Sequence, residues 1–478
     1  MPTTDARGAS DDTVADPALW SPGKRNRYAW MITLLLTFLM MLNWADKAVM
    51  GLAAVPIMKE MGITPGQFGL VSSGMFLAFT VSQLLVAPLS TKLPSRWLIL
   101  AMCGIWAVSN LPVVIFATLP ALWVSRLLLG VGEGPYAPLC MHSVYKWFPT
   151  KRGATPAAIA SSGVTIGIVA FAPILAVLIS SFGWKVAFLS LSGVGLLWAL
   201  VWIVVGKDGP YTSLAAEREI EGPDAAEQSV PQLVEQPVPF LRSILNPTWF
   251  FAVLVSFFGY WAFALCTSWG PAYFETVLGY SRRAAGSMIA LPAAWGFACT
   301  IALSNLTQRL DLKGVPTRWA RGLVVGLAGL VAGTCLTVST FVDHPGVALG
   351  LLSVGFGTAP ALFAVTYLIV GELTTIAQRP AHLNVANAGL SMGGVVAPSV
   401  AGFLIGAAST PAGGYISAFR LTGVLLAAAG LGCLIFVNQQ REQRKLGLLA
   451  HAVETDLDER TEKETGGGEY VTAGNQPS

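Results

Sequence analysis

Long apolar stretches alternate with short polar connections along most of the chain. Most of these stretches exceed the roughly 20 residues that an α-helix needs to cross about 30 Å of hydrocarbon. The pattern therefore predicts an all-α integral membrane protein with twelve transmembrane helices. The expected spans lie near residues 28 to 50, 66 to 90, 97 to 117, 119 to 146, 154 to 181, 184 to 206, 248 to 275, 285 to 308, 319 to 341, 345 to 371, 383 to 408 and 415 to 438.

Repeated features divide the chain into two halves. The fifth and eleventh spans share two glycines followed by a proline, at Gly163, Gly167 and Pro173 and again at Gly389, Gly393 and Pro398. Such recurrence in corresponding spans indicates an internal repeat, here two six-helix pseudo-repeats. We expect a cytoplasmic N-terminal tail at 1–27, six-helix bundles at 28–206 and 248–438, a cytoplasmic linker at 207–247 between them, and a disordered cytoplasmic tail at 439–478.

Charge is scarce and unevenly placed. Charged residues make up 12% of the 478 positions and mean hydropathy is +0.62, which leaves too little charge to cover a soluble protein of this size. If the spans alternate in direction, most basic residues beside short connections fall on the side of the termini, with the pair Arg282 and Arg283 as an exception. Basic residues near spans favour the cytoplasmic side. We expect a multi-pass protein of the cell (inner) membrane with both termini in the cytoplasm.

Four charges interrupt the apolar pattern. Asp46 and Lys47 lie in the first span, and Arg126 and Glu133 lie seven residues apart, two helical turns, in the fourth. A charge facing lipid would cost several kcal/mol, about 3 or more, so these side chains are expected to face protein or a water-filled cavity. Two other readings stay open. The first helix could end at Asp46 with both charges in water, or permanent ion pairs could lock the two helices together.

The chain has no pattern typical of an enzyme. No phosphate-cradling glycine loop, metal-ligand cluster or nucleophile triad is found in its connections, and the six cysteines read as buried thiols. We therefore expect no cofactor, no metal and no nucleic-acid partner. The expected partners are the lipid bilayer, protons and a small organic anion, and the protein is expected to be a monomer.

The stretch from Arg126 to Pro138 carries a family resemblance. Its arginine and glycines resemble the fourth-helix motif of the major facilitator superfamily, and Glu133 with Gly134 resembles the superfamily's anion:cation symporters, which include sugar-acid, phthalate and tartrate carriers and sialin-type transporters. The segment from Ser268 to Tyr273 resembles a further motif of these symporters. The chain departs from the family at Thr91, where an aspartate is usual.

The resemblance implies the major facilitator fold and a set of roles for the buried charges. In this family the first-helix acid and the fourth-helix glutamate take part in proton coupling, while basic residues hold substrate or structure. Transferred to this sequence, these family roles imply that Asp46 and Glu133 take part in proton coupling. The candidate substrate-binding residues are two cations and a set of wall residues: Lys47, Arg126, Trp44, Phe79, Tyr136, Trp269 and Ser391.

Physical chemistry supports such coupling. In a low dielectric, desolvation favours the protonated acid, and a neighbouring cation favours the carboxylate. An anion that competes for the cation would therefore favour protonation of the acid, which couples the two ligands reciprocally. The function expected is proton-coupled uptake of a small organic anion, such as a monocarboxylate, aromatic acid or sugar acid, by alternating access. Ser391 stands near a position where relatives often keep asparagine, which favours a monocarboxylate or aromatic acid.

Two alternatives remain at this point. The glycine-rich fifth span partly resembles the antiporter signature of drug exporters, which would make the protein a proton-driven exporter of small organic compounds. The other alternative is a sensor or scaffold that keeps the fold without transport. The charges in the first and fourth spans favour a transporter over a scaffold, because a scaffold gains nothing from their desolvation.

Overall fold

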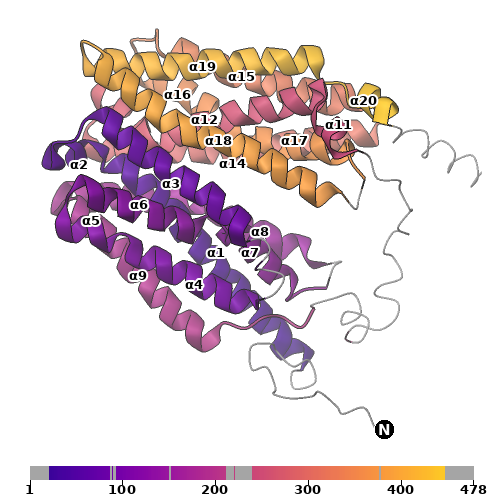
Figure 1. The fold of residues 1–478 in the computed structure, drawn as a ribbon, viewed down its shortest axis with the longest axis horizontal. Coiled ribbons are helices and arrows are strands. Elements are labelled where there is room, and N and C mark those ends of the chain that lie inside the picture. Colours follow the sequence, from indigo (N-terminus) through magenta and orange to yellow (C-terminus); the bar gives the residue numbers. More distant parts are fainter. Residues whose placement is uncertain are drawn as a thin grey trace, which may run out of the picture.

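The protein consists almost entirely of helices joined by short connections (Figure 1). The computed structural model describes residues 21–86, 89, 93–149, 152–211, 220, 239–375 and 378–446. The elements are α1 (Pro22–Leu52), α2 (Ala54–Met61), α3 (Pro65–Val86), α4 (Ser95–Ser109), α5 (Leu111–Phe116), α6 (Leu119–Glu133), α7 (Tyr136–Tyr145), α8 (Ala154–Phe182), α9 (Trp184–Val205), α11 (Phe240–Ile244), α12 (Pro247–Thr276), α13 (Arg282–Met288), α14 (Ala290–Leu312), the π-helical turn η4 (Arg318–Leu323), α15 (Val324–Ser339), α16 (Pro345–Gly357), α17 (Ala359–Glu372), α18 (Arg379–Ala407), α19 (Pro411–Phe436) and α20 (Gln439–Leu446).

The helices confirm the predicted twelve-helix fold. Within the described residues, eleven helical segments are long and apolar enough to cross a membrane unaided. The remaining span is the fourth, which consists of α6 and α7 and runs from Leu119 to Tyr145. It is divided at Gly134 and Pro135, because a proline inside a helix removes one backbone hydrogen bond and clashes with the preceding turn. The break follows Glu133 directly.

Several spans begin with a polar cap followed by proline. The Asn246 side chain accepts a hydrogen bond from the backbone N–H of Trp249 at 2.8 Å, and Pro247 is the first residue of α12. Thr410 and Pro411 open α19 in the same way. The cap satisfies a backbone donor at the helix start, and proline needs none there. These residues fix where each helix begins at the edge of the apolar layer.

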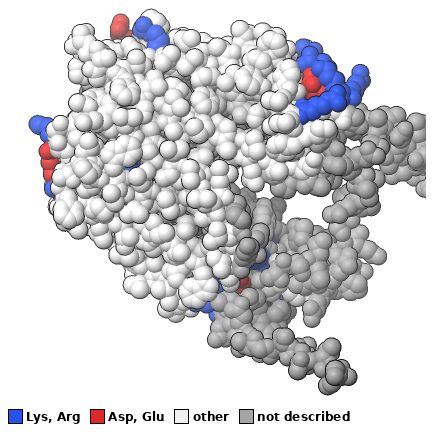
Figure 2. Space-filling view, viewed as in Figure 1, with Lys and Arg blue, Asp and Glu red and all other residues white. Residues whose placement is uncertain are grey.

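The spans form two bundles, one per half of the chain. In Figure 1 the first half, α1 to α9, lies below the second half, α12 to α19. Across the boundary α3 packs on α18, α1 packs on α12, and α8 packs on α13 and α14. Figure 2 shows charged side chains at the two ends of this face and an almost uncharged surface between them. Leu197, Leu200 and Val204 of α9 are exposed, as lipid-facing residues are.

The helix bounds differ from the expected domain limits at both termini. The first helix begins at Pro22, inside the expected N-terminal tail, and α20 forms within the expected disordered tail. The α20 helix is held by packing, because the Gln443 amide donates to the Glu372 carbonyl at 3.0 Å and Glu442 is 3% exposed. Residues 1–20, 212–219, 221–238 and 447–478 lie outside the described residues.

The two halves meet closely at one end of the molecule. We call this the closed end. It lies opposite the tail end, from which α1 starts and at which α19 finishes. A Cβ placed on Gly51 would collide with the Thr267 carbonyl oxygen, and one placed on Gly69 would collide with the Pro398 carbonyl oxygen. The backbones therefore touch directly there. The pair Ser73 and Ser399 adds a hydrogen bond of 2.6 Å between the hydroxyls.

Replacing Gly69 by valine is expected to prevent this closed-end contact and to abolish transport in a protein that still folds. The added side chain would take the space of the Pro398 carbonyl oxygen. In a background without native cysteines, a cysteine at Ser399 should become more reactive toward a membrane-impermeant maleimide. Gly104→Val is the matched control, because nothing lies within 4 Å of a Cβ at that position. Unchanged transport and labelling in Gly69→Val would contradict the prediction.

Candidate functional site

Four ionisable side chains from α1 and α6 are buried inside the first bundle. Asp46 and Lys47 come from α1, Arg126 and Glu133 come from α6, and none is more than 5% exposed. The structure thus brings together the four charges that the sequence singles out. It also excludes the reading in which α1 ends at Asp46, because α1 continues to Leu52. The four charges divide into two contacts of different construction.

The first contact is an ion pair between Lys47 and Glu133. Lys47 Nζ lies 2.6 Å from Glu133 Oε2, and it also donates to Asn43 Oδ1 at 2.7 Å. The ammonium group lies 5.1 Å from the ring centroid of Trp44 and 5.2 Å from that of Phe79. Aromatic faces attract a cation, and the attraction grows when water is excluded. Lys47 is therefore held by one carboxylate, one amide and two rings.

The second contact joins Asp46 to Arg126 through an amide. The indole N–H of Trp106 donates to Asp46 Oδ2, and Asn110 Nδ2 donates to Asp46 Oδ1 at 3.2 Å. Asn110 Oδ1 in turn accepts from the Arg126 guanidinium, whose carbon lies 5.0 Å from the Phe188 ring centroid. The amide turns its donor toward the acid and its acceptor toward the base. Asn110 therefore lies between Asp46 and Arg126 and links them by hydrogen bonds.

Sequence reasoning missed Trp106 and Asn110. Both come from the third span, at the junction of α4 and α5, and they are four residues apart, so they lie on one helix face. A signal was present, because Asn110 is an amide within an otherwise apolar stretch. Its partner could not be identified without knowing that α4 and α6 are neighbours.

Several buried polar atoms in this cluster have no partner among the described residues. They are Glu133 Oε1, Asn43 Nδ2, and Nε and Nη1 of Arg126. Buried polar atoms are nearly always hydrogen-bonded, so each exception calls for an explanation. Glu133 uses one oxygen for Lys47 and keeps the other free. A proton could be held on the free oxygen without displacing Lys47 from the first.

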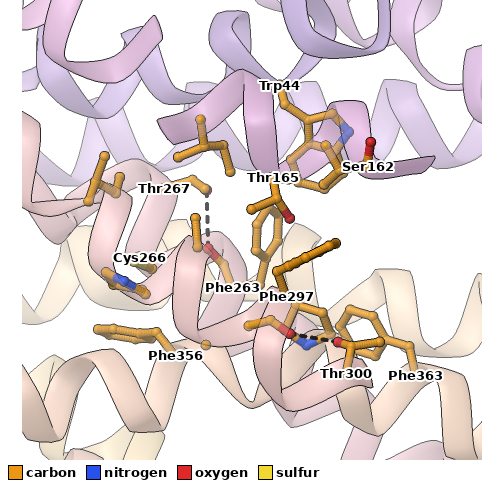
Figure 3. A pocket seen from close by; sticks show the side chains of 18 of the residues that line it. Trp44, Ser162, Thr165, Phe263, Cys266, Thr267, Phe297, Thr300, Phe356 and Phe363 are labelled. Atoms are coloured by element: carbon orange, nitrogen blue, oxygen red, sulfur yellow. Dashed lines mark hydrogen bonds between the residues drawn. The ribbon is translucent and has the colours of Figure 1, made fainter. Parts of the chain in front are cut away.

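Two large cavities are found between the halves, within the part of the chain that the structure describes. We call the first the aromatic chamber. It has a volume of about 500 Å³ and lies between α1 and α8 of the first half and α12, α14, α16 and α17 of the second. Figure 3 shows Trp44 and Thr165 on one side and Phe263, Phe297 and Phe363 on the other. Trp44 thus forms part of the chamber wall and also contacts Lys47.

The second cavity, the amide chamber, has a volume of about 670 Å³ and lies between α3, α7, α17 and α18. Three of its polar residues bond to one another. Asn387 Nδ2 donates to Gln83 Oε1 at 3.0 Å, and the Tyr367 hydroxyl donates to Asn387 Oδ1 at 2.7 Å. The first of these bonds joins the two halves of the protein. Gln83 belongs to the last turn of α3, so this chamber lies toward the tail end.

The predicted wall residues divide into two groups. Trp44 and Phe79 lie against Lys47. Tyr136 lies within the first bundle, where its hydroxyl donates to the Leu36 carbonyl at 2.6 Å. Trp269 is fully buried, with its indole N–H 3.2 Å from the Pro398 carbonyl oxygen, and belongs to the closed end. Ser391 is buried in α18 and lines neither chamber.

Comparison with known proteins identifies relatives. Residues 33–361 match the family described as Major Facilitator Superfamily. The chain is 26% identical over 434 residues to the "Probable sulfoacetate transporter SauU" of Cupriavidus necator, with 88% of this chain and 98% of that protein covered. It is 25% identical over 414 residues to the "D-galactonate transporter" of Escherichia coli, with 84% and 95% covered.

Solved structures share the fold. A bacterial homologue of the human lysosomal transporter Spinster, in an inward-facing and unoccupied conformation, matches with a TM-score of 0.71 and 18% identity, covering 87% of this chain and 98% of that one. The D-xylose-proton symporter matches with a TM-score of 0.67 and 16% identity, covering 87% and 99%. These findings confirm the predicted family and the prediction of a transporter rather than an enzyme. This twelve-helix chain belongs to the Major Facilitator Superfamily.

Proposed function

We propose that the protein is a proton-coupled symporter that takes up a small organic anion by alternating access. The observation that carries this proposal is the position of Lys47. Its ammonium group pairs with Glu133 and lies against Trp44, which lines the aromatic chamber. An anion that enters from this chamber would find one cation within reach, already paired with a titratable acid.

The proposed cycle couples the two ligands through competition for Lys47. A substrate carboxylate that approaches Lys47 would weaken the hold of Lys47 on Glu133, and Glu133 would then bind a proton more readily. By reciprocity, a proton on Glu133 would strengthen anion binding by the same factor. With the acid protonated and the anion paired, the cluster loses net charge, which lowers the electrostatic cost of closing the halves around it.

The other two charges have a positioning role in this proposal. None of the four charges lines a chamber. Lys47 contacts the chamber residue Trp44, whereas Asp46 and Arg126 are joined through Asn110. The family resemblance assigns proton coupling to Asp46 and substrate binding to Arg126. The geometry favours a different division, in which the amide-linked pair fixes α1 against α4 and α6, and Lys47 with Glu133 exchanges ligands.

Orientation is part of the proposal. Most Lys and Arg residues of the connections lie at the tail end, and two of the closed-end cations are paired there, Lys185 with Glu60 at 2.7 Å and Arg282 with Glu275 at 3.1 Å. Lys185 also lowers the pKa of Glu60, which lies outside the spans. We place the tail end in the cytoplasm of a cell with an inner membrane. The relatives named as transporters of sulfoacetate and D-galactonate support an organic anion as substrate.

Transport into proteoliposomes under imposed pH gradients tests the proposal. We expect at least one acid from a panel of radiolabelled sulfoacetate, D-galactonate and benzoate to accumulate when the outside is more acidic. A protonophore should abolish the accumulation. Empty liposomes correct for passive entry of weak acids. Accumulation only under the opposite gradient would support the exporter instead, and no accumulation under either gradient would remove the proposal.

A further inference from the structure

We infer that the substrate is a monocarboxylate with an aromatic or otherwise apolar body, rather than a polyhydroxylated sugar acid. The inference rests on the proposed function, because it takes Lys47 as the partner of the substrate's anionic group. It departs from the substrates named for several relatives, which include D-galactonate and hexuronate transporters.

The wall of the aromatic chamber carries the inference. Its lining includes six aromatic side chains, Trp44, Tyr260, Phe263, Phe297, Phe356 and Phe363. Trp44 and Phe263 stand edge to face with centroids 5.1 Å apart, and Tyr260 packs against Phe263 and Phe363. The rings come from both halves of the protein. A flat apolar body placed between them would touch both halves at once.

Three of the hydroxyl groups that line this chamber are already engaged. Ser162 donates to the Ile159 carbonyl at 2.7 Å, Thr300 to the Gly296 carbonyl at 2.8 Å, and Thr267 to the carbonyls of its own helix (Figure 3). Ser161 donates to the Met141 sulfur at 3.7 Å, and the Thr165 hydroxyl has no hydrogen bond among the described residues. A sugar acid would bring more hydroxyls than these groups can serve, and each one left over would lose its water without gaining a matched partner.

A further hydroxyl comes from the second half of the protein. The Tyr260 hydroxyl has no hydrogen-bond partner among the described residues, and its ring lines the chamber. Tyr260 comes from α12, whereas Trp44, which contacts Lys47, comes from α1. It supplies one donor that a carboxylate oxygen could accept from. Lys47 and the Tyr260 hydroxyl could together hold one carboxylate, while the six rings of the wall leave little polar surface for a chain of hydroxyls.

The amide chamber is more polar, but its central polar groups are already engaged. Gln83, Asn387 and Tyr367 bond to one another, while Asn384 and His142 also line the chamber. A sugar acid that used the amides of Gln83 and Asn387 would compete with the bond that joins the halves. The volume of the aromatic chamber, about 500 Å³, lies within the range of about 300–1,000 Å³ that small-molecule pockets occupy, so size permits a ringed acid.

Calorimetric titration of the purified protein in detergent tests the inference. The probes are benzoate, D-galactonate and benzyl alcohol, with detergent alone as the blank for partitioning. We expect benzoate to bind at least about 100-fold more tightly than D-galactonate, the factor by which an apolar pocket rejects a single added hydroxyl. Benzyl alcohol, which has the ring but no charge, should bind much more weakly than benzoate.

Two variants locate the site. Phe363→Ser should weaken benzoate binding about tenfold, as the loss of an apolar contact does. Phe250→Ser, on the exposed face of α12, is the matched control and should leave benzoate binding unchanged. The inference would be overturned if D-galactonate bound as tightly as benzoate. It would also be overturned if Gln83→Leu weakened binding of the acid while Phe363→Ser left binding unchanged. If only the symport proposal failed, the titration would still show a preference for benzoate, but no acid would accumulate in proteoliposomes under a pH gradient.

Discussion

Replacing Glu133 by glutamine is expected to abolish proton-driven accumulation of substrate. Glutamine keeps the shape of the side chain and an oxygen for Lys47, but it cannot exchange a proton near neutral pH. Under the proposed cycle, a fall in pH would protonate Glu133, weaken its hold on Lys47 and tighten binding of an anion that stays ionised. In Glu133→Gln the competitor is permanently neutral, so binding should be tight and independent of pH.

The measurement is the dissociation constant of the bound acid at a series of pH values, together with accumulation in proteoliposomes. Glu60→Gln is the matched control, because Glu60 is an exposed acid that also pairs with a lysine, Lys185. It should leave both readouts unchanged. If Glu133→Gln kept the pH dependence of the native protein, the ion pair with Lys47 would be a permanent structural contact and the coupling would reside elsewhere.

Replacing Arg126 by methionine is expected to cause the largest loss of stability among the charge variants. The variant leaves Asp46 buried and negative, with Asn110 no longer linked to a cation. Removing one partner of a buried pair costs about 3–5 kcal/mol, because the remaining charge has lost its compensation. We expect a lower midpoint of thermal unfolding in detergent and a smaller folded fraction.

A double-variant cycle separates this structural role from one in transport. Arg126→Met together with Asp46→Asn removes both charges, and most of the lost stability should return. In the single variant, loss of transport should follow the loss of folded protein. A fully stable Arg126→Met protein that fails only in substrate binding would contradict the positioning role and restore Arg126 as a substrate ligand.

The sequence predicts the spans well, because the bilayer requires apolar stretches of fixed length. The broken fourth span follows from Pro135, and the meeting of α1 with α6 follows from the high cost of leaving four charges in lipid. The sequence does not predict which buried charge pairs with which. Lys47 pairs with Glu133, and Asp46 reaches Arg126 through Asn110. This pairing depends on the rotation and depth of three packed helices, which spacing along one helix does not determine.

The chamber walls were harder to predict for another reason. The chain has 15 Trp and 23 Phe residues, and in a membrane protein a ring can face lipid, pack between helices or line a cavity. Trp269 follows a family motif but packs at the closed end, whereas Phe363 carries no motif and lines the aromatic chamber. In a soluble protein, apolar residues indicate the interior because the exterior is polar. In a membrane the exterior is apolar too, so an apolar residue in the sequence does not indicate burial.

The contact between Gly69 and the Pro398 carbonyl involves no residue that lines the aromatic chamber. Gly69 sets how tightly α3 and α18 approach, while Phe363 belongs to α17 and lines that chamber. Turnover and cargo choice can therefore diverge independently in descendants of this protein. A lineage could change the rate of its carrier through this backbone contact and still carry the same substrate.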